Sequence, residues 1–265
     1  MEELFCLCAS SDHATRTRAV SEAVTRLARD GVGRPPDLAP AFRRVHASSA
    51  GEASSVAARL IAGLHLEQEY IASRKVARAF LWGFASSLDD VIAFARARSG
   101  GNNAFDRWTR QEVLRAAAEI GRAPIGDVLD RVSPFFRVSS RDLTTAAISG
   151  GGHIGWESAR SDPASRSLLA AAFGDPRVSV EFHDGAGREA VYDQVWMGMR
   201  VRDMGIIDDE DLWDFYARCE KARQGPLEER DSSVRAWLVD MGSRRVSNAL
   251  REACVLLARE REARG

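Results

Sequence analysis

The sequence predicts a mainly α-helical protein, an irregular multi-helix bundle that carries one small β-hairpin in its C-terminal half. Apolar residues recur at helical spacing along most of the 265 residues. Glycines, prolines and capping residues interrupt this pattern at short intervals, and a single segment alternates between apolar and polar residues as a strand does. The alternative is a HEAT-like helical solenoid, since successive helical pairs would span about 35 to 45 residues. However, no consensus recurs between the pairs.

Residues 1–134 are predicted to form a helical bundle domain. Each predicted helix has an apolar stripe and ends at a glycine, a proline or a polar turn. Ser87 with Asp90, and Thr109 with Glu112, are expected to form capping boxes. The segment 67–84 is apolar on several faces, so we expect it to be central. The stripes predict helices that end near Gly31 and that cover 38–45, 52–64, 67–84, 87–95, 109–120 and 124–132.

Residues 135–265 are predicted to form a mostly helical second domain, unless the whole chain is one continuous domain. Helices are expected to start at Ser140, at Asp162 with Pro163, and at Asp208. Two more are expected over 234–241 and from 243 to the end of the chain. Between them, alternation over 178–182 followed by a glycine-containing turn predicts a β-hairpin over 178–192. This hairpin must lie against helices, because an isolated hairpin is marginally stable.

The charges are balanced, with 37 basic and 38 acidic residues and a net charge of −1. This balance argues against a nucleic-acid-binding protein, although the N-terminal half leans basic and its arginines leave nucleic-acid binding as an alternative. Lys75 and Lys221 are the only lysines. So much arginine suits bidentate recognition of anions, but it is also what a GC-rich genome produces.

The chain is expected to be a reduced, cytoplasmic protein of bacterial type that does not enter a membrane. Its four cysteines are few and poorly spaced for a disulfide framework. The N-terminus lacks the pattern of a secretory signal. No apolar run approaches the roughly 18 residues that a membrane span requires.

A glycine-rich loop over 149–156 is the most unusual local stretch. Its glycines would let backbone N–H groups approach an anion closely, and its histidine could transfer protons near neutral pH. It matches neither the phosphate-binding loop that ends in Gly-Lys-Ser/Thr nor the dinucleotide-binding glycine pattern. A helix C-cap followed by a flexible linker between the two halves of the chain is the favoured explanation. The candidate binding residues in this loop are Gly150, Gly151, Gly152, His153 and Trp156.

Two further groups are candidates for binding. Of the six tryptophans, Trp156 and Trp196 lie in the irregular half, where exposure as a binding hot spot is expected. The acidic residues Asp208, Asp209 and Asp211 either open a helix, as its dipole favours, or meet a basic partner.

No metal, cofactor or catalytic residue is predicted. Asp89–Asp90 lacks a further acid one turn along, and Cys6-x-Cys8 lacks the other ligands of a zinc site. The leading hypothesis is therefore a non-enzymatic protein that binds another protein, as an adaptor, an immunity protein or a subunit of a cytoplasmic complex. A homo-oligomer is left open as an alternative assembly. The alternative is a small enzyme or an anion- or nucleotide-binding protein with its site at the loop 149–156.

Overall fold

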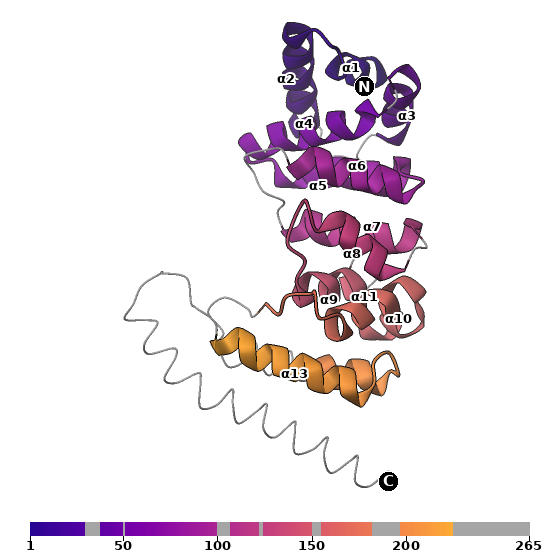
Figure 1. The fold of residues 1–265 in the computed structure, drawn as a ribbon. Coiled ribbons are helices and arrows are strands. Elements are labelled where there is room, and N and C mark those ends of the chain that lie inside the picture. Colours follow the sequence, from indigo (N-terminus) through magenta and orange to yellow (C-terminus); the bar gives the residue numbers. More distant parts are fainter. Residues whose placement is uncertain are drawn as a thin grey trace, which may run out of the picture. The chain divides into compact units, whose positions relative to one another are not determined.

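The computed structural model describes residues 1–29, 38–49, 51–99, 107–121, 124–149, 155–181 and 197–224. Within these ranges the chain is mainly helical, as predicted (Figure 1). It divides into two compact units, which we take one at a time. The first unit comprises Met1–Arg137 with Ser149–His153, and the second comprises Val138–Ile148 with Ile154–Gly265.

Helices of unequal length build the first unit, and each packs mainly on helices that are close to it in the sequence. Helix α1 contacts α2 and α3, and α4 contacts α2, α5 and α6. This arrangement fits the predicted irregular multi-helix bundle. The helices are α1 (Glu2–Cys8), α2 (His13–Arg29), α3 (Ala39–Ser48), α4 (Glu52–Leu66), α5 (Tyr70–Arg78), the π-helix η2 (Ala79–Phe84), α6 (Leu88–Ser99), α7 (Arg107–Gly121) and α8 (Ile125–Val132).

A cluster of phenyl rings forms the centre of the first unit. The Phe42 ring centroid lies 5.2 Å from that of Phe5 and 5.4 Å from that of Phe80. Phe80 in turn stacks on Phe94 at 5.1 Å and contacts Phe84 at 5.0 Å. Such offset and edge-to-face contacts add to the free energy gained by burying the rings. The cluster therefore joins α1, α3, η2 and α6 in one core.

The prediction of one central helix over 67–84 is wrong for its first part. Helix α5 starts only at Tyr70, after Gln68 takes a positive φ of 59°, and the helix widens into η2 at Ala79. The buried face of α5 consists of small side chains, with Ala72 and Ala77 among them. The large side chains Tyr70 and Ile71 consequently point outward. An apolar segment can thus be buried on one face only, through its smallest residues.

Glycine permits a close approach between α2 and α4. A Cβ atom at Gly63 would lie 2.6 Å from Cγ2 of Val24, well inside van der Waals contact. At Gly83 in η2, a Cβ atom would lie 2.8 Å from Cβ of Ala39. At both positions another helix approaches so closely that a side chain would not fit without a shift of its neighbours.

Replacing Gly63 by alanine is expected to lower the free energy of unfolding by about 1–3 kcal/mol, because the new methyl group overpacks against Val24. Adding Val24→Ala should recover part of this loss, since it removes the clashing atom. Urea denaturation of the two single variants and the double variant measures this coupling. If the two substitutions lower the free energy of unfolding in a strictly additive way, α2 and α4 do not contact each other at Val24 and Gly63.

The capping predictions have different outcomes. At α6 the capping box is confirmed: Asp90 Oδ2 accepts from the backbone N–H of Ser87 at 3.1 Å, and Ser87 Oγ accepts from Asp90 N–H at 3.3 Å. The second box is wrong, because Thr109 lies inside α7 and the buried Glu112 accepts a hydrogen bond from the indole N–H of Trp82 at 2.7 Å.

The second unit is also helical in its described part. Asp162 caps its central helix as predicted, accepting from Ser165 N–H at 2.7 Å. Phe173 and Phe215 pack with ring centroids 4.7 Å apart and join that helix to the last described one. The helices are α9 (Ser140–Ser149), α10 (Trp156–Ser161), α11 (Pro163–Gly174), a short helix over 197–203, and α13 (Asp209–Gln224).

The predicted β-hairpin is not seen. Residues 178–181 form no strand, and Ser179 makes an isolated parallel bridge with Ser139. The backbone groups that a partner strand would use have other partners: Ser179 C=O accepts from Ser140 N–H at 2.8 Å, and Val178 C=O accepts from Arg218 at 3.0 Å. The expected return arm, 188–192, lies outside the described residues.

Candidate functional site

The structure describes four of the nine predicted binding residues, all in the second unit: Trp156, Asp208, Asp209 and Asp211. The loop residues Gly150, Gly151, Gly152 and His153, and also Trp196, lie outside the described residues. The hypothesis of a site at the glycine-rich loop therefore stays a prediction.

Trp156 is half-buried at the first turn of α10. The Arg200 guanidinium lies over its ring, 5.2 Å from the centroid, in a cation–π contact. The same guanidinium lies 3.5 Å from a carboxylate oxygen of Glu157. Trp156 thus has a packing role within its own unit.

The acidic residues act at the start of α13. Asp208 Oδ1 accepts from Asp211 N–H at 2.9 Å, and Asp211 Oδ2 accepts from Asp208 N–H at 3.4 Å. Asp209 lies 3.6 Å from the Arg202 guanidinium. Helix capping and ion pairing therefore account for these aspartates in the described structure.

An exposed apolar surface lies where α4 turns into α5. We name it the α4–α5 corner and define it by Leu66, Tyr70 and Ile71, whose side chains are 77%, 56% and 68% exposed. Among the large apolar residues of the described ranges, Leu7 on α1 is the other exposed one, at 48%. Exposed apolar residues scattered singly are normal, but three within six positions form a patch of the kind that marks interaction sites.

Contacts with His65 and Ser73 position Tyr70 within the corner. The Tyr70 ring packs on the His65 ring with centroids 5.5 Å apart. His65 Nε2 lies 3.1 Å from the hydroxyl of the buried Ser73, which donates to the Tyr70 carbonyl at 2.8 Å. Tyr70 is consequently positioned before any partner binds, which reduces the entropy that binding would cost.

Arginines continue the same face of α5 beyond the corner. Arg74 and Arg78 follow Tyr70 at intervals of four residues, so all three lie along one side of the helix. Both guanidinium groups lie over the half-exposed Trp108 ring, at 5.2 and 5.9 Å from its centroid. Arg78 also lies 3.4 Å from Glu112. The face thus runs from an apolar end to a basic, aromatic end.

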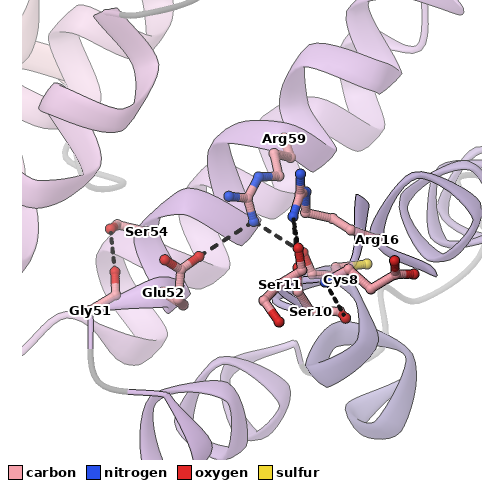
Figure 2. Close-up of polar contacts among 9 residues, drawn as sticks. Cys8, Ser10, Ser11, Arg16, Gly51, Glu52, Ser54 and Arg59 are labelled. Carbon is pink, nitrogen blue, oxygen red and sulfur yellow. Dashed lines mark hydrogen bonds and ion pairs between the residues drawn. The ribbon is translucent and has the colours of Figure 1, made fainter. Parts of the chain in front are cut away.

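A pocket of about 490 Å³ lies elsewhere in the first unit, beside the segment that joins α1 to α2. Figure 2 shows Arg16 of α2 and Arg59 of α4 both pointing toward this segment. Arg16 donates to the Ser10 carbonyl at 2.8 Å, and Arg59 donates to the Cys8 carbonyl at 3.0 Å. The pocket is lined by Cys6, Ala9, Ser10, Ser11, Arg16, Ser49, Glu52 and Arg59.

Cys8, whose carbonyl accepts from Arg59, has a fully buried side chain that stays a thiol at neutral pH. Burial raises the pKa of the Cys8 thiol from 9.0 to about 11, and the positive charge of Arg59 opposes part of this rise. A buried thiol of this kind is a packing group and not a nucleophile.

The raised pKa of Cys8 predicts a loss of stability in alkali. Because folding favours the protonated thiol, its contribution is fully present below pH 9.0 and is lost as the pH rises to about 11. We expect Cys8→Ala to lose less stability than the parent chain over this interval. Urea denaturation below pH 9.0 and near pH 11 measures the difference, and equal losses in the two chains would refute it.

The sequence analysis missed the α4–α5 corner and the pocket. It assigned Tyr70 and Ile71 to a central helix, although the smaller residues Ala72, Ser73, Val76 and Ala77, which recur at helical spacing, indicated which face would be buried. Arg16 and Arg59 are isolated arginines in the sequence. No local signal shows that the fold brings their helices to the same segment.

The described ranges contain no group of three or more His, Cys, Asp or Glu side chains that could hold a metal ion. Asp89, one of the paired carboxylates, instead contacts Arg131 at 2.5 Å. Among the helices of these ranges, none has the length and apolarity that crossing a bilayer requires. Comparison with protein-family models, with curated proteins and with solved structures finds no match for this chain.

Proposed function

We propose that this chain is a non-enzymatic helical protein that binds another protein through the α4–α5 corner, as an adaptor, an immunity protein or a subunit of a complex. The observation that supports this most is the exposure of Leu66, Tyr70 and Ile71 together. Burying apolar surface contributes about 25 cal/mol of stabilising free energy for each Å² removed from contact with water. The three exposed side chains do not gain this free energy in the unbound chain. A partner that covers the corner recovers this free energy.

The composition of the face supports a protein partner. Tyrosine, tryptophan and arginine are enriched in the hot spots of protein interfaces. Tyr70, Trp108, Arg74 and Arg78 supply all three residue types along one side of α5 and the adjoining α7. The apolar corner would form the centre of such an interface and the arginines its rim.

The charge of the face supports an acidic partner segment. The arginine end of the face is basic, and among the described residues Arg74 has the Trp108 ring as its partner and no carboxylate. We propose that the bound segment carries an apolar anchor for the corner and acidic side chains that face Arg74 and Arg78. Such a pairing accelerates association and fixes the orientation of the partner.

A photo-crosslinking residue placed at Ile71 tests this proposal in cells of the native host. The matched control carries the same residue at Leu7, which is also an exposed apolar side chain of the first unit. We expect a protein adduct at position 71 that is absent at position 7 and that is lost when Arg74 is changed to glutamate. No adduct at position 71, or the same adducts at both positions, would overturn the proposal.

A further inference from the structure

We infer that the pocket between α1, α2 and α4 binds a small organic oxyanion, a carboxylate or a phosphate ester, through Arg16 and Arg59. This site is separate from the α4–α5 corner and does not depend on protein binding there. Its volume of about 490 Å³ is within the range of small-ligand sites and exceeds what a single inorganic ion fills.

The charges of the pocket favour an anion. Two guanidinium groups line it, from different helices, and Glu52 is the one carboxylate among its lining residues. Glu52 lies 3.4 Å from Arg59, so one positive charge stays without a carboxylate inside the pocket. Asp12 precedes α2 and is not among the lining residues. The hydrogen bonds from Thr15, and to a lesser extent the charges of Arg16 and Arg18, lower the pKa of its carboxyl.

Both arginines are positioned for a ligand by contacts that use only part of their hydrogen-bonding capacity. Each uses Nη1 for its contacts: Arg16 donates to Ser10 and Ser11 carbonyls, and Arg59 donates to the Cys8 carbonyl and to Glu52. Among the described residues, none accepts from Nη2 or Nε of either guanidinium. A guanidinium held in this way can bind an oxyanion through its other N–H groups.

The other lining groups suit an organic ligand that carries hydroxyl or amide groups. Ser11 and Ser49 are exposed at the edge of the pocket and have hydroxyls that both donate and accept hydrogen bonds. The thiol of Cys6, 3.9 Å from the Ser48 hydroxyl, adds a weakly polar side. The pocket therefore offers two cationic donors for an oxyanion and neutral polar groups for the remainder of the molecule.

Calorimetric titration of the full chain with phosphate and with acetate, at constant ionic strength in chloride, tests this site. We expect saturable binding of at least one of them, and the tighter one shows which oxyanion the natural ligand carries. Arg59→Gln should weaken binding about tenfold, because it removes a charge-assisted contact. Glu52→Gln should strengthen binding, since it removes the competing carboxylate.

Arg44→Gln is the matched control, because Arg44 pairs with Glu2 at 3.2 Å but does not line the pocket. Its affinity for the anion should equal that of the parent chain. If Arg59→Gln does not fold, the Glu52→Gln titration decides alone. Absence of saturable binding to the parent chain, or an affinity that Glu52→Gln leaves unchanged or weakens, would overturn the inference.

Discussion

Replacing both Tyr70 and Ile71 by alanine is expected to weaken binding of the protein partner by about 30-fold or more. Truncating a hot-spot residue typically costs about 2 kcal/mol or more, which corresponds to that change in affinity. Both side chains are more than half exposed, so their removal should change the free energy of unfolding by only about 0.5 kcal/mol. Surface plasmon resonance with the crosslinked partner, and urea denaturation, measure the two quantities.

Leu7→Ala provides the control for this double variant. Leu7 is 48% exposed and lies on α1, so its truncation should leave the affinity unchanged. Arg74→Glu should slow association, most strongly at low salt, because the acidic partner would then meet a like charge. If the parent chain and the Tyr70→Ala/Ile71→Ala variant bind the partner with equal affinity, the α4–α5 corner is not part of the interface.

Phe42→Ala is expected to lower the free energy of unfolding by about 3–5 kcal/mol. It removes the ring that contacts both Phe5 and Phe80 and leaves a cavity that the surrounding helices can fill only in part. Because most domains are stable by only about 5–15 kcal/mol, this is the largest stability effect that we expect.

Phe135→Ala is the comparison for Phe42→Ala, since its ring is half-buried beside α8 under the Arg96 guanidinium. We expect Phe135→Ala to lower the free energy of unfolding much less than Phe42→Ala does. Chemical denaturation of the three chains measures the difference. Similar losses for Phe42→Ala and Phe135→Ala would contradict the description of Phe42 as the centre of the core.

Local signals in the sequence predicted the features that depend on neighbouring residues. Helical periodicity and the caps at Ser87 and Asp162 act within a few residues, and the structure confirms them. The hairpin failed because its first arm finds backbone partners far away, at Ser140 and Arg218. A local alternation of side chains does not reveal such long-range hydrogen bonds.

The candidate sites depend on tertiary structure in the same way. Tyr70 and Ile71 have the composition of core residues, and their exposure follows from the small residues that α5 turns toward the other helices. Arg16 and Arg59 come from α2 and α4, two helices that approach closely at Val24 and Gly63, and both donate to carbonyls of the segment that joins α1 to α2. The four described residues that the sequence singled out have packing, capping or ion-pairing roles within the second unit.

Amide hydrogen exchange of the full chain, with and without the partner that crosslinking identifies, tests the central claim most directly. If the partner covers the α4–α5 corner, binding should slow exchange in the segment from Leu66 to Arg78 and at the start of α7. The amides around Leu7 on α1 should exchange at the same rate in both states. Protection that falls in the second unit, with unchanged exchange from Leu66 to Arg78, would contradict the claim.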